Sequence, residues 1–251
     1  MLLRKIFSRK WWFTTLLVLF GAAVCIRLGI WQLDRLEGRR AFNAQVQTMR
    51  ARAPVDLTTA ELGGLETMEW RAVTVTGEYD FANQVVLRNQ YNKDQYGYHL
   101  LTPLLFNTST GSVQAPTAVL VDRGWIPADG NSAPGDWRKY DEAGVVTVTG
   151  QIRLGQSKPA FGGVPDAPPA DGSPLWVWNN ADIENIALQL PYPILNVYIQ
   201  PNVEPDDDVP PIPYQPVIEL TEGPHFGYAL QWFTFAAILL FGYPFYLRKQ
   251  E

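Results

Sequence analysis

His225 is the side chain in this sequence with the clearest chemical potential. The chain contains two histidines, His99 and His225, and a single cysteine, Cys25, which lies inside an apolar segment. His225 begins an uncharged, aromatic-rich run that ends at Leu247. Because an imidazole nitrogen is a common axial ligand of haem iron, this position predicts a metal-macrocycle site at the edge of a membrane helix, with His225 as the axial ligand.

Aromatic neighbours of His225 strengthen that hypothesis. On a helix, residues three, four and seven positions apart share a face, so Tyr228, Ala229 and Trp232 line one groove with His225. Two rings and a small gap would suit a flat apolar macrocycle. The alternative is an interfacial belt of His, Tyr and Trp, which any membrane protein can have. The pattern alone leaves both open.

Enzymatic signatures are scarce. The sequence has no phosphate-binding loop, dinucleotide fingerprint, His-Glu-x-x-His pair or nucleophile elbow. It has too few Cys and His residues for a zinc site of those ligands. We therefore predict a protein that is not an enzyme, with no catalytic residues. A hydrolase built on scattered carboxylates is a minor alternative.

Two apolar segments predict two membrane helices, because about 20 apolar residues span a bilayer. They cover residues 11–31 and 225–247. A cleaved signal peptide is the alternative for the first, but its apolar run is long and no small-x-small cleavage site follows. Basic residues flank the outer end of each segment: Arg4, Lys5, Arg9, Lys10, Arg248 and Lys249. The positive-inside tendency then places both termini in the cytoplasm.

The predicted organisation follows from these spans. The chain begins with a cytoplasmic basic stub (1–10), a membrane helix (11–31) and its helical extension (32–52). An extracytoplasmic domain with an acidic Pro-rich linker follows (53–216). The chain then returns through a re-entry segment (217–224) and a second membrane helix (225–247) to a cytoplasmic tail (248–251). The central domain is acidic, which argues against nucleic-acid binding. One cysteine allows no intramolecular disulfide. The stub is too short for a mitochondrial presequence, so we expect a bacterial plasma membrane.

The central domain has the two-residue period of β-strands. Strands are expected at 72–79, 84–90, 98–106, 117–123, 145–152 and 194–200, with a short helix at 180–190 capped by Asn180. The fold class is therefore an α+β membrane protein, in which two terminal transmembrane helices flank a mainly antiparallel β domain of about six strands. Its sheet should close or be covered, because open edges aggregate.

Three polar features of this domain have mainly structural interpretations. His99 is expected to be an ordinary strand histidine. Arg123 is expected to be a buried arginine, held by a carboxylate or stacked on Trp125. The aspartates 206–208 lack the Gly and distal Glu of a calcium loop, which favours an extended acidic linker.

Several short motifs now resemble one family. Leu28-Gly29-x-Trp31-Gln32-Leu33-x-Arg35-Leu36, Leu120-Val121-Asp122-Arg123-Gly124-Trp125 and His225-x-x-Tyr228-Ala229-x-x-Trp232-Phe233 occur in this order. Together with the two spans and the large loop, they resemble the Surfeit locus protein 1 family of cytochrome c oxidase assembly factors. The resemblance covers nearly the whole chain. It departs from the family where an aromatic–lysine step is replaced by Glu37-Gly38-Arg39-Arg40, and where Gly223-Pro224 precede the histidine.

The resemblance implies that the protein helps to build a haem–copper oxidase. It implies transient binding of haem a through His225, with Tyr228, Trp232, Trp31 and Gln32 around the cofactor, and delivery to the oxidase catalytic subunit. Gly29 would allow close approach of the helices. Implied partners are that subunit, other assembly factors and haem a synthase. The alternative is a scaffold that binds no haem and holds oxidase subunits during assembly.

Overall fold

The computed structural model describes residues 8–108, 116–159, 163, 165–167, 169, 171–205 and 208–250. The predicted basic positions 4 and 5, and Asp206 and Asp207 of the expected linker, lie outside these ranges. The chain divides into two compact units, residues 1–45 with 218–251, and residues 46–217. Each is described by itself.

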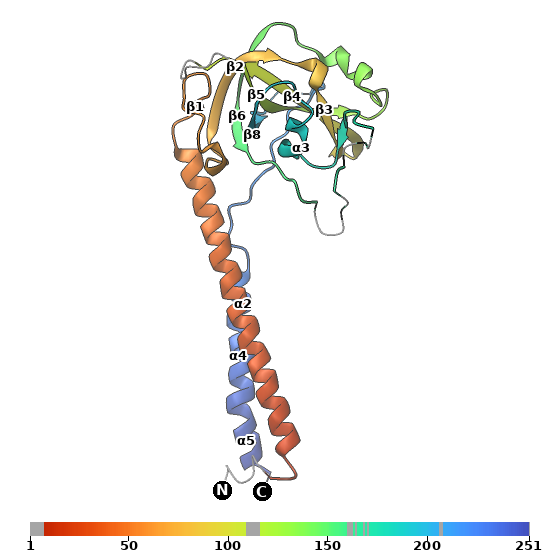
Figure 1. Ribbon diagram of the computed structural model, residues 1–251. Helices are drawn as coiled ribbons and strands as arrows, with labels where there is room; N and C mark the ends of the chain where they lie inside the picture. The colour runs from red at the N-terminus through yellow and green to blue at the C-terminus, as the bar shows by residue number, and fades with distance from the viewer. Residues whose placement is uncertain are drawn as a thin grey trace. The chain divides into compact units, whose positions relative to one another are not determined.

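The first unit is an antiparallel pair of helices. Helix α2 spans Trp12–Ala51 and ends one residue before the predicted boundary. The returning helix consists of α4 (His225–Ala237), a π-helical turn η4 (Ile238–Gly242) and α5 (Tyr243–Arg248). Figure 1 shows α2 and α4–α5 side by side, and a 2.6 Å hydrogen bond between the hydroxyls of Thr15 and Tyr243 joins their outer ends.

Both helices are long and apolar enough to cross a membrane, judged by length and composition. At 1.5 Å per residue, the 40 residues of α2 extend about 60 Å, roughly twice the hydrocarbon thickness of a bilayer. Its second half therefore continues beyond the apolar segment, as expected. The π-helical turn precedes Pro244, which lacks the N–H that would bond the carbonyl of Leu240.

Mostly small and polar side chains form the contact between these helices. Five buried residues of α2 recur every seven positions, namely Thr15, Ala22, Gly29, Leu36 and Asn43, and Val46 is buried as well. The returning helix buries Ala229 and Ala236 at the same spacing. A seven-residue repeat is the signature of left-handed helix packing. Small residues let membrane helices approach closely, and their large apolar residues are left on the exposed surface.

The second unit is a closed, mainly antiparallel sheet. Its strands are β1 (Val55–Asp56), β2 (Ala72–Tyr79), β3 (Val85–Asn92), β4 (Gln95–Phe106), β5 (Thr117–Pro127), β6 (Val145–Arg153), β7 (Val177–Trp178) and β8 (Ile194–Pro201). The order is β1-β2-β6-β8-β5-β4-β3-β7, and pairing of β2 with β4 closes five strands into a barrel. The expected fold class and closure are confirmed.

Several boundaries differ from the sequence-based expectation. The described sheet has eight strands instead of about six, because β1 and β7 are two-residue strands that carry no periodic signal. The expected helix 180–190 shortens to α3 (Ile183–Ala187). Its N-cap is Asp182 and not Asn180, because the Asp182 carboxylate accepts the N–H of Asn185, whereas Asn180 donates its own N–H to Asp166.

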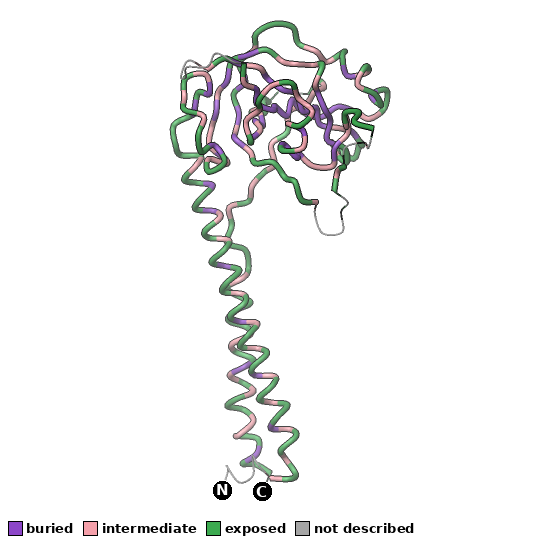
Figure 2. Tube along the Cα trace, in the orientation of Figure 1, coloured by how far each residue is buried: buried purple, intermediate pink, exposed green. Residues whose placement is uncertain are grey.

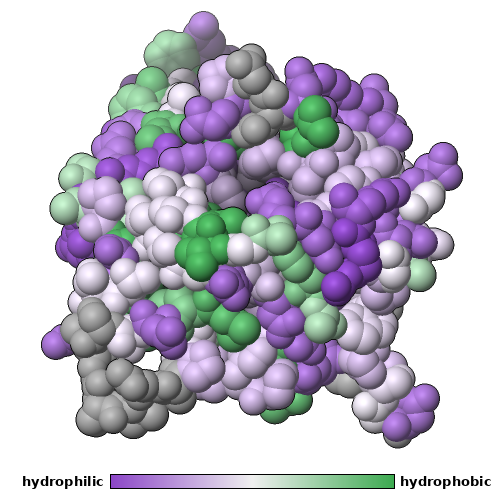
Figure 3. All heavy atoms as spheres, turned by 90° about the horizontal axis from the view of Figure 1, so that it is seen from above, coloured by the Kyte–Doolittle hydropathy of each residue, from purple (hydrophilic) through white to green (hydrophobic). Residues whose placement is uncertain are grey.

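The core of this unit lies inside the barrel. Branched aliphatic side chains fill it, among them Val73, Val75, Leu104, Val121, Ile152 and Ile199. A second cluster, which includes Trp178, packs α3 against the sheet. Buried residues accordingly gather along the strands in Figure 2. The face seen in Figure 3 is mostly polar, with apolar residues in small separate groups.

Candidate functional site

The candidate site begins with one hydrogen bond between the two helices of the first unit. Nδ1 of His225 lies 2.9 Å from Oε1 of Gln32, across 193 positions of sequence. Because the carboxamide oxygen only accepts, Nδ1 carries the hydrogen, and the lone pair of the neutral ring is then on Nε2. Within the described residues, no hydrogen bond reaches Nε2. The ring is therefore oriented as a metal-binding imidazole requires.

Helix packing sets the register of this pair. A Cβ atom added at Gly29 would lie 2.7 Å from Cε1 of Phe233, closer than real Cβ contacts allow. Gly29, which lies about one helical turn before Gln32 on α2, therefore makes room for the Phe233 ring. The predicted close approach at Gly29 is present, and it fixes how far Gln32 stands from His225.

The segment that precedes α4 is tied to α2 by three polar side chains. Arg39 donates to the backbone oxygens of Thr221 and Glu219, and Asn43 donates to that of Thr221. Arg40 makes two 2.8 Å hydrogen bonds to the carboxylate of Glu222. These hydrogen bonds, with the charge of Arg40, lower the pKa of Glu222.

Gly223 completes the turn into α4. Its φ of 69° lies in the left-handed region that favours glycine. A Cβ there would stand 3.6 Å from Nε2 of His225. Glycine at this position therefore allows the backbone turn, whereas the space beside the His225 ring would admit a Cβ at ordinary contact distance.

A cavity of about 240 Å³ opens beside the histidine. It is lined by Asp34, Arg35, Gly38, Arg39, Phe42 and His225. Pockets that enclose small organic ligands usually measure about 300–1,000 Å³, so this cavity accepts only part of a larger ligand. The two arginines give it a surplus of positive charge over its single carboxylate.

The other predicted site residues are near Gln32 or His225 in sequence but do not contact His225. Trp31 is 46% exposed and Tyr228 is 47% exposed. The Trp232 ring meets Phe235 edge-on, with centroids 6.0 Å apart. No hydrogen bond or ring contact in the described ranges connects these three to His225, and their roles as cofactor contacts stay predictions.

Sequence reasoning missed the arginine side of the cavity. The available signal was spacing, because Arg35, Arg39 and Phe42 follow Gln32 at three-, seven- and ten-residue intervals and so continue its helix face. The contact of Arg39 with the residues before His225 depends on the antiparallel register of the two helices, which the sequence does not state.

The other histidine has a different environment. His99, on β4, is buried and its Nδ1 lies 2.9 Å from Oδ2 of Asp122 on β5. Burial lowers the pKa of His99, but the charge of Asp122 and its hydrogen bond outweigh burial and leave the pKa raised. This pair is a buried structural contact, as the strand interpretation expected.

Arg123 is also structural, with one correction. Its guanidinium lies over the neighbouring rings of Tyr79 and Phe81, 5.0 Å from each centroid, and it bonds Glu142 at 3.1 Å. The expected carboxylate partner is present. The alternative of stacking on Trp125 is wrong, because the Arg123 guanidinium lies over the rings of Tyr79 and Phe81 instead.

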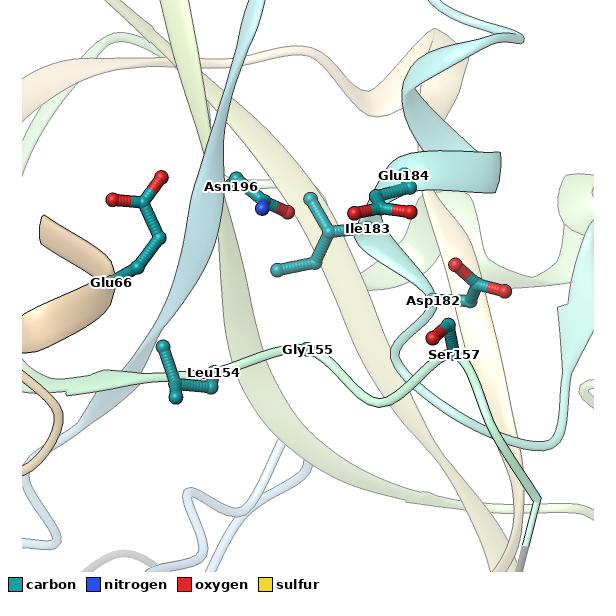
Figure 4. Close-up of a pocket in the computed structure, with 8 residues that line it drawn as sticks. All are labelled: Glu66, Leu154, Gly155, Ser157, Asp182, Ile183, Glu184 and Asn196. Atoms are coloured by element: carbon teal, nitrogen blue, oxygen red, sulfur yellow. The ribbon is translucent and has the colours of Figure 1, made fainter. Parts of the chain in front are cut away.

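A second cavity, of about 200 Å³, lies in the β unit (Figure 4). Three acidic side chains line it, Glu66, Asp182 and Glu184, but the Asp182 carboxylate caps α3. No group of three or more His, Cys, Asp or Glu residues in the described part of the chain could hold a metal ion. This cavity offers neither an imidazole nor a cation, in contrast to the one beside His225.

Comparisons with known proteins agree with the motifs. The SURF1 family profile matches residues 19–237, which include both Gln32 and His225. A SURF1-like protein of Rickettsia conorii is 25% identical over 245 residues, covering 94% of this chain and 92% of its own. An uncharacterized SURF1-like protein of Mycobacterium tuberculosis is 26% identical, covering 92% and 81%. Surfeit locus protein 1 of Rattus norvegicus is 24% identical, covering 66% and 55%.

A profile match of this extent, with two candidate membrane helices and a closed β domain between them, leaves a single assignment. The chain belongs to the SURF1 family, a family of assembly factors and not a known enzyme family, and membership implies a role in cytochrome c oxidase assembly.

Proposed function

We propose that this protein binds haem a through His225 and aids its insertion into the catalytic subunit of cytochrome c oxidase. The observation that carries the proposal is the Gln32–His225 hydrogen bond, in which the Nδ1–H donates to the carboxamide oxygen and leaves Nε2 free. In metal-binding histidines, the N–H of the second ring nitrogen commonly donates a hydrogen bond to a nearby oxygen acceptor. When bound, the haem supplies an iron centre that takes an axial nitrogen ligand.

The geometry also suits a carrier that must release its cargo. His225 begins α4, and the cavity beside it is too small to enclose a macrocycle. A site with one axial ligand and an open side holds a cofactor without burying it. Trp31, Tyr228 and Trp232 are the residues we propose as further contacts, since all three are aromatic and stand within seven positions of Gln32 or His225.

We further propose the location and partners. Both termini would lie in the cytoplasm of a bacterium, the β domain would be extracytoplasmic, and the site would face outward at the plasma membrane. The partners would be the oxidase catalytic subunit, other assembly factors and haem a synthase. Reporter fusions at either terminus test this topology, and an extracytoplasmic terminus would contradict it.

Absorption spectroscopy tests the haem proposal. The full chain is purified in detergent from cells that make haem a. We expect bound haem in the parent, loss of most of it in His225→Ala, and a changed spectrum in His225→Met, which substitutes a thioether ligand. Gln231→Ala is the control, since Gln231 is exposed on the same helix. Equal haem in His225→Ala and the parent would refute the ligand assignment.

The competing proposal is a scaffold that binds no haem. It is supported by the exposed apolar residues of both helices, because only 17% and 11% of their apolar windows are buried. A parent protein that co-purifies with the oxidase subunit, yet lacks haem under all conditions, would favour this function over the carrier.

A further inference from the structure

The cavity beside His225 carries charge as well as an imidazole. Arg35, Arg39 and Phe42 lie on one face of α2 at four- and three-residue steps, and Asp34 is the single carboxylate of the lining. Arg35 follows the end of the predicted membrane segment by four residues, about 6 Å along the helix. The cavity therefore lies beyond the end of the predicted membrane segment, and its two arginines favour a negatively charged group.

The two arginines have different partners. Arg39 is held by the carbonyl oxygens of Thr221 and Glu219 and lies over the Phe42 ring at 5.5 Å. These partners are uncharged, so they position the guanidinium without neutralising it. Arg35 has no hydrogen bond or ion pair to any group of the described chain, and neighbouring Asp34 forms no ion pair with it. Arg35 therefore has its full set of donors available to a ligand.

Open space adjoins Arg35 on the same helix face. A Cβ atom added at Gly38, three residues on, would meet no atom within 4 Å. The arginine can therefore extend over this position without a clash. A planar guanidinium binds a carboxylate through two parallel hydrogen bonds, which a lysine cannot reproduce.

From this arrangement we propose that Arg35 binds a carboxylate of the ligand held by His225, so that the site selects a metal macrocycle with free acid side chains. This inference deepens the proposed haem function and depends on it. The ligand class is a haem whose propionates are ionised. Arg39 is positioned by its hydrogen bond to the backbone oxygen of Thr221 and adds positive charge to the cavity. Arg35 makes the direct contact with the ligand carboxylate. The bound macrocycle then has its acid edge toward the water and its apolar edge toward the membrane.

The test compares two probes that differ only in the acid groups. The full chain in detergent is titrated with ferric protoporphyrin IX and with its dimethyl ester, and affinity is read from the absorption spectrum. The parent should bind the diacid about tenfold or more tightly than the ester, the size expected for a charge-assisted hydrogen bond. Arg35→Gln should lose about tenfold in affinity for the diacid and none for the ester.

Matched variants separate charge from geometry. Arg35→Lys should recover part of the diacid affinity, because it keeps the charge and loses the fork. Arg35→Glu should bind the diacid more weakly than Arg35→Gln. Arg50→Gln, at an exposed arginine of α2 outside the cavity, is the control and should bind both probes like the parent. Circular dichroism checks that each variant keeps its helices.

The outcomes distinguish this inference from the function beneath it. If His225→Ala abolishes binding while Arg35→Gln binds both probes like the parent, the haem proposal stands and the Arg35 assignment is overturned. Equal loss of both probes in a folded Arg35→Gln also overturns it, since the arginine would then act on the helix pair. If the parent binds neither probe, both proposals fall.

Discussion

The two histidines of this chain lie in different units, and one is hydrogen-bonded to a carboxylate while the other is hydrogen-bonded to a neutral carboxamide. His99 is buried in the barrel with its Nδ1 against the carboxylate of Asp122, whereas His225 is half-buried between helices with its Nδ1 against the neutral amide of Gln32. Burial lowers the pKa of His99, but the charge and hydrogen bond of Asp122 leave it raised, and the pair is a structural contact. The neutral amide oxygen of Gln32 accepts the N–H of Nδ1 of His225, and no hydrogen bond from the described residues reaches Nε2.

The two units differ in packing for a related reason. The barrel buries branched aliphatic side chains, and its strands also bury the hydrogen-bonded side chains of His99 and Asp122. The helix pair buries small residues at a seven-residue spacing and leaves its large side chains outside. A ligand site between such helices therefore depends on a few close contacts, and a single added methyl group can disturb it.

The largest expected effect comes from crowding the contact between the two helices at Gly29. Gly29→Ala places a Cβ 2.7 Å from the Phe233 ring, and overpacking of this kind costs about 1–3 kcal/mol. We expect the helices to separate and haem retention to fall about tenfold or more, while the His99 pair is unaffected. Gly21→Ala is the matched control, because its Cβ meets Leu239 at an ordinary 3.4 Å. Equal haem in the two variants would contradict this account of the register.

The next effect comes from changing the hydrogen-bond partner of His225 at Gln32. Gln32→Leu removes the acceptor and should weaken haem binding about tenfold, the lower end of the loss usual for such a supporting hydrogen bond. Gln32→Glu gives His225 the kind of partner that His99 has, and a proton then competes with the iron. As pH falls, haem binding by this variant should weaken more than binding by the parent. Parallel pH profiles, measured by haem titration, would refute the role of the neutral amide.

The smallest effect concerns the pH dependence of the barrel. Because Asp122 leaves the pKa of His99 raised, the stabilisation is complete below the unfolded pKa of about 6.5 and is lost as pH rises through the folded value. The thermal midpoint of the full chain should therefore fall over that interval. Asp122→Asn should flatten the profile and lower the midpoint, while His225→Ala should leave its shape unchanged. A midpoint that rises with pH would contradict the sign.

Much of the fold could be predicted because its signals are local. The apolar runs at 11–31 and 225–247 and the alternation at 72–79 follow from residue type and spacing, and β2 occupies the predicted range. The two-residue strands β1 and β7 could not be found, since so short a segment has no period. The cap of α3 was misassigned by two residues because Asn180 and Asp182 are both good capping residues.

By itself, the sequence determined the two helices, the β character of the domain between them and the choice of His225 as the ligand candidate. These are consequences of hydrophobic length, periodicity and the scarcity of ligating side chains. The tertiary structure decided that Gln32 meets His225, that Arg39 is held by the segment before α4 and that Arg35 faces the cavity without a hydrogen-bond partner among the described residues. Such pairings depend on the register of two helices that are nearly 200 residues apart in the chain. That register is set by contacts such as Gly29 with Phe233, which no local pattern encodes.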